Sequence, residues 1–264
     1  MFNPNEVILE KIRAVEEYDP ETNEITGRYT QIESPALQTT ANGVTVTDSM
    51  GAEIATFYNA QTGTFSFTNS VHSLDLMASQ FGSEKEIAED DKKLIMPVSE
   101  MITIGSDHTA VLKYVPVGTE GAEVKYVKLI NENNEFGKTY EVSAAAGEGK
   151  FTIDAATRTI TMPDDVTGKI FVRYEKETST AVKVSKRTDS VPKVKSLLIH
   201  AIFHNKCNVN TVYSGVISVS RAQIDPTTVD VNLTPDGKHS ASYKLQKNYC
   251  DEDGKLFDII ISED

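Results

Sequence analysis

Residues 63–68 read Gly63-Thr64-Phe65-Ser66-Phe67-Thr68, and this short stretch decides the fold class. Its aromatic side chains alternate with small polar ones, and residues two apart in a strand point to the same face of a sheet. The alternation therefore predicts a β-strand whose aromatic face lies in a core.

The same period of two recurs along the chain. Further stretches rich in Val, Ile, Thr, Tyr and Phe lie at residues 43–47, 122–130, 151–153, 159–162, 169–174, 212–219 and 228–233. Turn-forming residues separate them, as at Asn42-Gly43 and at residues 131–134, 163–165 and 235–238. Many short strands at this spacing are typical of a β-sandwich or β-barrel, so we expect a mainly β protein.

Residues 71–81 break this pattern. Apolar side chains recur there at steps of three and four residues, as on one face of a helix: Val71, Leu74, Met77, Ala78 and Phe81. Either Asn69 or Ser70 can cap the start of such a helix, and Gly82 stands where it would end. We expect one short amphipathic α-helix whose apolar stripe packs on the sheet.

Residues 97–192 have the features of an inserted domain. Pro97 and Pro192 flank this set of predicted strands, and the polar run 185–190 precedes the second boundary. Residues 1–96 and 193–264 would then form one discontinuous β domain, with a sheet closed by strands from both ends of the chain. The charged segment 83–93 fits an exposed arm, a strand edge or a loop equally well.

The formal net charge of –13 is concentrated near the start of the 264-residue chain. Residues 1–90 hold 15 acidic and 4 basic side chains, residues 91–190 hold 15 and 14, and residues 191–264 hold 9 and 8. The local balances are thus –11, –1 and –1. Proteins that read DNA gain affinity by placing Lys and Arg against phosphates, so this distribution excludes that class of function.

Residue patterns for catalysis or metal binding are nearly absent. His200 and His204 are close enough in sequence to share a site, with Cys207 and Cys250 as further ligands, but the spacings of known zinc motifs are missing. Residues 251–254 resemble the opening of a calcium loop, yet an apolar strand follows directly, which favours a hairpin turn. We expect no metal, no cofactor and no enzymatic activity. Two cysteines favour reduced thiols, and a single bridge stays open.

The chain contains no run near the roughly 20 apolar residues that a membrane span needs. Residues 1–6 lack the basic and apolar regions of a signal peptide. We therefore expect the protein to begin in the cytoplasm, without a membrane partner.

Residues 51–70, together with the predicted helix, resemble the strand, strand and helix core of tailed-bacteriophage tail tube proteins. Residues 215–237 and a closing strand through residues 256–260 are similar to the ending of that family. The middle segment resembles the immunoglobulin-like sandwiches that phage virion proteins carry as insertions. The resemblance implies a tail-tube-like β-sandwich or barrel with an inserted immunoglobulin-like domain.

The resemblance also implies a structural virion protein. Its subunits would form stacked hexameric rings of a tail tube, with themselves and other tail proteins as partners, and DNA would pass through without specific binding. We hypothesise that Asp48 and Glu53 face the channel, and that residues 1–35 and the segment after Gly82 join the rings. A capsid decoration protein and a carbohydrate- or surface-binding module are the alternatives.

Overall fold

A computed structural model describes residues 5–227, 229, 231–235, 237–249 and 254–263. The chain is mainly β, with one α-helix in this described part, which confirms the expected fold class. It divides into two compact units, unit 1 (residues 1–85 and 184–264) and unit 2 (residues 86–183). The division differs from the predicted boundaries because β8 (Leu94–Thr103) runs across the first of them, while the Gln223 side chain ties Pro192 to unit 1 at 2.7 Å.

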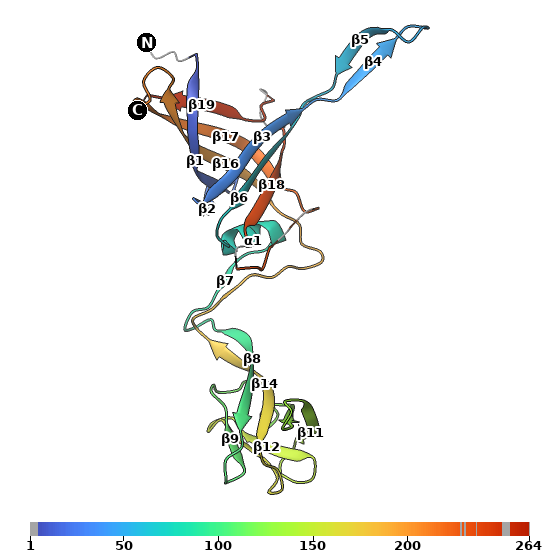
Figure 1. Ribbon diagram of the computed structural model, residues 1–264, viewed down its shortest axis with the longest axis vertical. Helices are drawn as coiled ribbons and strands as arrows, with labels where there is room; N and C mark the ends of the chain where they lie inside the picture. The colour runs from blue at the N-terminus through green and yellow to red at the C-terminus, as the bar shows by residue number, and fades with distance from the viewer. Residues whose placement is uncertain (1–4, 228, 230, 236, 250–253, 264) are drawn as a thin grey trace. The chain divides into compact units, whose positions relative to one another are not determined.

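Unit 1 is built on an eight-stranded sheet in the order β2-β1-β16-β17-β18-β6-β3, with β19 beside β17 (Figure 1). Its strands are β1 (Val7–Tyr18), β2 (Ile25–Tyr29), β3 (Ile32–Thr40), β6 (Thr62–Asn69), β16 (Val194–Asn205), β17 (Val212–Ile224), β18 (His239–Leu245) and β19 (Asp258–Ser262). All pairings are antiparallel, and β1 also contacts β3, so the sheet is nearly closed into a barrel.

Two pairings join the ends of the chain. β1 pairs with β16, and β6 pairs with β18 along its whole length. Residues 7–35, which we expected to join the rings, are not a free arm, because β1 is an inner strand of the sheet and β2 and β3 follow it. Their role in joining rings stays a prediction. Residues 1–4 lie outside the described part of the chain.

The alternation in β6 produces the predicted core face. Phe65 and Phe67 are each 2% exposed, and Phe67 stacks on Tyr243 of β18 with ring centroids 6.1 Å apart. Such aromatic pairs contribute about 0.5–1.5 kcal/mol beyond the area that they bury. The predicted strand 228–233 is wrong for the residues that the structure describes there, since Val231 makes only an isolated bridge to His239. Residues 228 and 230 are not among them.

Helix α1 (Leu74–Phe81) begins and ends at capping residues. Ser73, rather than Asn69 or Ser70, is the N-cap, and its hydroxyl accepts a hydrogen bond from the Leu76 amide. Gly82 ends the helix as predicted, with a left-handed φ of 66°. The predicted stripe is mostly wrong, because Leu76, Ala78 and Gln80 are buried, while Leu74 is 44% exposed.

A buried carboxylate holds α1 against the sheet. Glu17 lies on the inner face of β1 with no exposed surface, and it accepts hydrogen bonds from the hydroxyls of Ser79 in α1 (2.6 Å) and Tyr243. Burial raises the pKa of the Glu17 carboxyl, and these two hydrogen bonds oppose the shift only in part. A second polar link runs from the Gln80 amide to the Ser240 carbonyl oxygen at 2.7 Å. The helix is thus fixed by polar contacts at two points of its buried face.

Unit 2 contains a seven-stranded sheet in the order β8-β14-β10-β11-β12-β13-β9, around a core of its own. Its strands are β8, β9 (Thr109–Val111), β10 (Tyr126–Ile130), β11 (Phe136–Val142), β12 (Lys150–Asp154), β13 (Thr159–Thr161) and β14 (Lys169–Thr178). The short strands β7 (Glu86–Ile87) and β15 (Val182–Lys183) pair with each other, so the segment after Gly82 includes a strand.

Two antiparallel groups make up the sheet of unit 2. They are joined by a two-residue parallel pairing between β11 and β12. The predicted strand 122–130 begins only at Tyr126, because Gly121 has a φ of 73° and the Ala122 amide closes a turn onto Thr119. The immunoglobulin-like class of this unit stays a prediction.

Replacing Gly82 by alanine tests the helix end. A left-handed conformation costs an L-residue about 1–2 kcal/mol, and a Cβ at position 82 would lie 2.1 Å from the Val191 carbonyl oxygen. Gly51 has a φ of 86° but open space around its Cβ position, so Gly51→Ala is the matched control. Chemical denaturation should show that Gly82→Ala destabilises unit 1 clearly more than Gly51→Ala. Equal losses would contradict the predicted clash.

Glu17→Gln tests the buried carboxyl. The folded state holds a proton on Glu17 at pH values where the unfolded state, with a pKa near 4.5, has lost it. The unfolding free energy of the wild type should therefore fall relative to Glu17→Gln as the pH rises above 4.5, by at most about 1.4 kcal/mol per pH unit. Denaturation at a series of pH values measures this difference.

Glu16→Gln is the control of opposite sign. A hydrogen bond from Tyr18 lowers the pKa of the neighbouring Glu16 carboxyl on the outer face of β1, and His200 and Arg28 add to the effect. The stabilisation by the Glu16 carboxylate should therefore be lost as the pH falls from 4.5 through the folded pKa. Equal pH profiles for the two variants would contradict the assignment.

Candidate assembly surface

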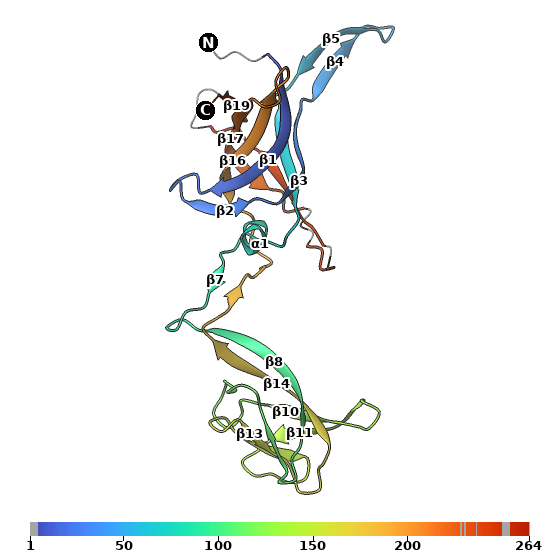
Figure 2. The same cartoon turned by 60° about the vertical axis from the view of Figure 1, so that its left-hand side comes forward.

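A two-stranded ribbon continues from β3 and β6 beyond the barrel. Strand β4 (Gly43–Thr47) follows β3 without reversing direction, and β5 (Glu53–Tyr58) returns antiparallel to it and leads into β6. The Asn59 amide donates to the Asn42 carbonyl oxygen at 2.8 Å, which keeps the ribbon paired across the junction. The turn predicted at Asn42-Gly43 is therefore wrong. Figures 1 and 2 show the β4–β5 hairpin leading away from the sheet of unit 1.

One face of the hairpin is apolar and uncovered. Val44 and Phe57 are directly opposite in the register, as are Val46 and Ala55, so all four side chains share a face. Val44 is 59% exposed and Phe57 66%. The other face carries hydrophilic groups, including the Thr45 and Thr56 hydroxyls in contact at 3.0 Å. We expected the alternation in residues 43–47 to place one face of a strand in a core. This expectation is wrong for the single chain, because Val44 and Val46 are exposed.

The hairpin is also unpaired at its edges. In the described part of the chain, β4 and β5 form a sheet of two strands only. Isolated hairpins are marginally stable in water, and free strand edges invite pairing with another chain. An amphipathic ribbon of this kind is suited to contact with a partner.

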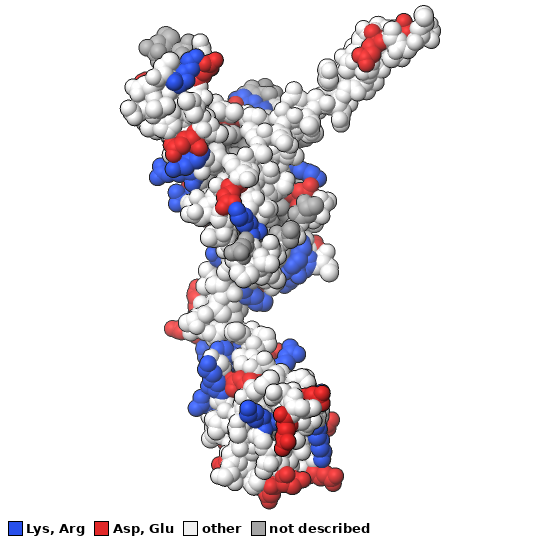
Figure 3. Space-filling view, viewed as in Figure 1, with Lys and Arg blue, Asp and Glu red and all other residues white. Residues whose placement is uncertain are grey.

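Both acids that we predicted to face a channel lie near the hairpin tip. Asp48 is not on a strand but in the turn, where its carboxylate accepts hydrogen bonds from the Met50 and Ala52 amides, both at 2.8 Å. Glu53 is the first residue of β5. Figure 3 shows acidic side chains on the hairpin, and the sequence has no Lys or Arg between residues 29 and 84. Their orientation toward a lumen stays a prediction.

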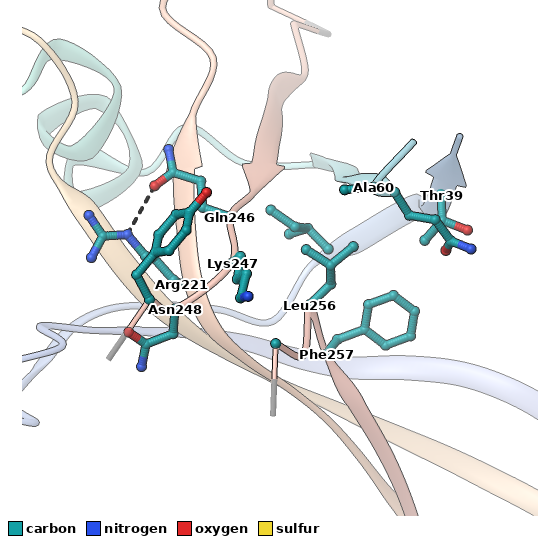
Figure 4. A pocket seen from close by; sticks show the side chains of 12 residues that line it. Thr39, Ala60, Arg221, Gln246, Lys247, Asn248, Leu256 and Phe257 are labelled. Carbon is teal, nitrogen blue, oxygen red and sulfur yellow. Dashed lines mark hydrogen bonds between the residues drawn. The ribbon is translucent and has the colours of Figure 1, made fainter. Parts of the chain in front are cut away.

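A pocket of about 910 Å³ lies at the base of the same ribbon. Thr39 lines it from the end of β3, and Gln61 lines it from the residue before β6. Leu256 and Phe257 line it from the segment before β19 (Figure 4). The described lining has two basic residues, Arg221 and Lys247. The Arg221 Nε donates a hydrogen bond to the side-chain oxygen of Gln246 at 3.1 Å.

The last strand, β19, offers a second surface for pairing. It pairs with β17 on one side, and no second described strand pairs with it. Ile259 and Ile260 are 55% and 57% exposed. An apolar edge strand is a site for addition of a strand from another chain.

The two histidines that we considered as metal ligands are bound to different carboxylates. His200 contacts Glu16 at 3.1 Å, and His204 contacts Glu10 at 2.8 Å and the Val209 carbonyl oxygen at 2.6 Å. The hydrogen bond to Glu10 raises the pKa of the His204 imidazole, and the Val209 carbonyl adds to this effect.

No group of three His, Cys, Asp or Glu side chains in the described ranges could hold a metal ion. Cys207 is a free, exposed thiol, whereas Cys250 and the predicted turn at residues 251–253 lie outside the described part of the chain. No described helix has the length and apolar character needed to cross a membrane.

The apolar hairpin face and the pocket at its base were not predicted from the sequence. The strands themselves were predicted, but alternation cannot show whether an apolar face meets the chain's own core or a partner. One signal was available, namely the lack of Lys and Arg over residues 29–84, which leaves the hairpin purely acidic in charge.

Two phenylalanines of adjacent strands test the difference between the hairpin and the barrel. Phe57→Ala should change the unfolding free energy of dilute protein by no more than about 0.5 kcal/mol, because the ring is exposed. Phe67→Ala, the matched control in the core, should cost about 3–5 kcal/mol. Urea denaturation measures both. A loss for Phe57→Ala as large as that for Phe67→Ala would contradict an exposed hairpin.

Comparison with known proteins identifies no family for this chain. No protein-family model matches it, and no curated protein matches it significantly.

Proposed function

We propose that this protein is a structural subunit that assembles into stacked hexameric rings, the tube of a bacteriophage tail, through which DNA passes. In this proposal the protein resides in the virion tail and binds copies of itself and other tail proteins. It has no catalytic role. Unit 2 is an inserted immunoglobulin-like domain on this subunit.

The exposed apolar face of the β4–β5 hairpin carries the proposal. A ribbon with Val44 and Phe57 more than half exposed is stabilised when a neighbour covers it. The apolar strand β19, which pairs with β17 alone among the described strands, adds a second surface. Two different surfaces on one chain favour head-to-tail contacts, which close into rings or continue as stacks.

The charge of the chain supports a conduit rather than a DNA-binding protein. The –13 net charge comes mostly from residues 1–90, which contribute strands of the nearly closed sheet and the hairpin. A wall rich in carboxylates repels phosphates at short range, and salt screens the repulsion beyond about 10 Å. DNA would therefore pass without being held.

Assembly of the purified full-length chain tests the proposal. Light scattering on a concentration series, with negative-stain electron microscopy of the same samples, should show six-membered rings or hollow tubes. Phe57→Ala should shift assembly to higher protein concentration. A wild-type chain that remains at 29.0 kDa at every concentration contradicts the proposal, and binding to capsids or glycans would then favour a decoration protein or a surface-binding module.

A further inference from the structure

We infer that the end of the barrel next to α1 holds a site for a divalent transition-metal ion such as Zn²⁺, with His239, Asn69 and His72 as its ligands. The inference is independent of the proposed function, because it rests on buried lone pairs and not on a contact between subunits. The sequence led us to expect no metal, since these three residues form no known ligand motif.

His239 presents a buried nitrogen that lacks a partner. The residue has no exposed surface, and Nδ1 of its ring makes no hydrogen bond to any described residue. Nε2 of the ring lies 2.7 Å from Oε1 of Gln80. The nitrogen of that amide donates to the Ser240 carbonyl oxygen at 2.7 Å, and a carbonyl can only accept, so the orientation of the amide is determined. Nε2 of His239 therefore carries the proton. A second proton on a fully buried ring without an acceptor would be costly, so Nδ1 has an unshared lone pair.

Asn69 presents a second acceptor without a partner. The residue is 2% exposed, its amide nitrogen donates to the Val71 carbonyl oxygen at 2.7 Å, and its Oδ1 makes no hydrogen bond within the described part of the chain. Asn69 of β6 and His239 of β18 are directly opposite in the antiparallel register, so their side chains share the inner face of the sheet. Side chains in such a pair have Cβ atoms about 4.5–5.5 Å apart. Two buried lone pairs without donors thus come from neighbouring side chains.

His72 adds a third ligand from the segment between β6 and α1. The centroid of its ring lies 6.0 Å from that of His239, and the residue is exposed to solvent. An exposed side chain changes rotamer readily, which gives an ion a route to the buried acceptors. Imidazole nitrogens are preferred ligands of Zn²⁺, and the amide oxygen of Asn69 and a water molecule complete a tetrahedral set.

The hydrogen bonds behind the acceptors favour an ion over a bridging water. A histidine that binds a metal usually donates its other ring N–H to an oxygen acceptor, which fixes the tautomer and the orientation of the ring. His239 already has this arrangement through Oε1 of Gln80, and Ser240 holds Gln80 in turn. A water could satisfy the same two lone pairs by donating both of its protons, but it would not need His72. The two alternatives therefore differ in whether His72 takes part.

Zinc titration of the full-length chain, without a histidine tag, tests the inference. Isothermal titration calorimetry should show one Zn²⁺ bound per chain. His72→Ala should weaken binding at least about tenfold and leave the stability of the metal-free protein near that of the wild type, because the side chain is exposed. His204→Ala, which removes a histidine of unit 1 that contacts Glu10, is the matched control and should bind Zn²⁺ like the wild type. No binding by the wild type, full binding by His72→Ala, or loss of binding in His204→Ala would overturn the inference.

Nitrogen NMR of the imidazole rings identifies the ligating atoms. The metal-free chain should show His239 with its proton on Nε2, and Zn²⁺ should shift the resonance of its Nδ1 together with one nitrogen of His72. Resonances of His239 that do not respond to Zn²⁺ would overturn the inference and indicate a water between the two acceptors. Neither result depends on ring assembly, which light scattering measures separately.

Discussion

The pairing of strands from opposite ends of the chain is the constraint on which unit 1 depends. β1 lies between β2 and β16, and β6 lies between β3 and β18, so neither end of the chain can form the sheet alone. The core follows from this pairing, since Phe67 of β6 packs on Tyr243 of β18. The chain leaves unit 1 at residue 85, after α1, and returns at residue 184, before β16. Unit 2 therefore interrupts no strand of the sheet of unit 1.

The helix shows how a barrel end can be closed with polar groups. Leu76 and Ala78 supply the apolar contact, but Ser79 and Gln80 make the hydrogen bonds that set the helix position. Glu17 is the acceptor for one of them, and its neutral form suits a site with no exposed surface. The face of α1 that meets the sheet therefore includes polar residues that bind Glu17 and Ser240. This is why the buried face of the helix does not coincide with the apolar stripe expected from the sequence.

The sequence was sufficient where burial and period agree. β6 was predicted from its alternating aromatic residues, and Gly82 was predicted as the helix end because a left-handed residue is required there. The sequence was insufficient where tertiary contacts decide which face of an element is buried. Val44 and Val46 alternate as a buried strand does, yet they face solvent. Neither the Ser73 cap nor the pocket at Arg221 has a local signature, because the cap depends on where the chain turns and the pocket joins segments that are far apart in the sequence.

The charge of the β4–β5 hairpin limits what can cover its apolar face. A ribbon with free edges promotes nonspecific pairing of a lone chain. Asp48 and Glu53 lie near its tip, and the sequence has no Lys or Arg between residues 29 and 84. Two hairpins that approach each other therefore repel, whereas a different surface of a second copy does not carry this penalty. Such a ribbon favours contact between two unlike surfaces, and a contact of that kind has the direction that an assembly with two distinct ends requires.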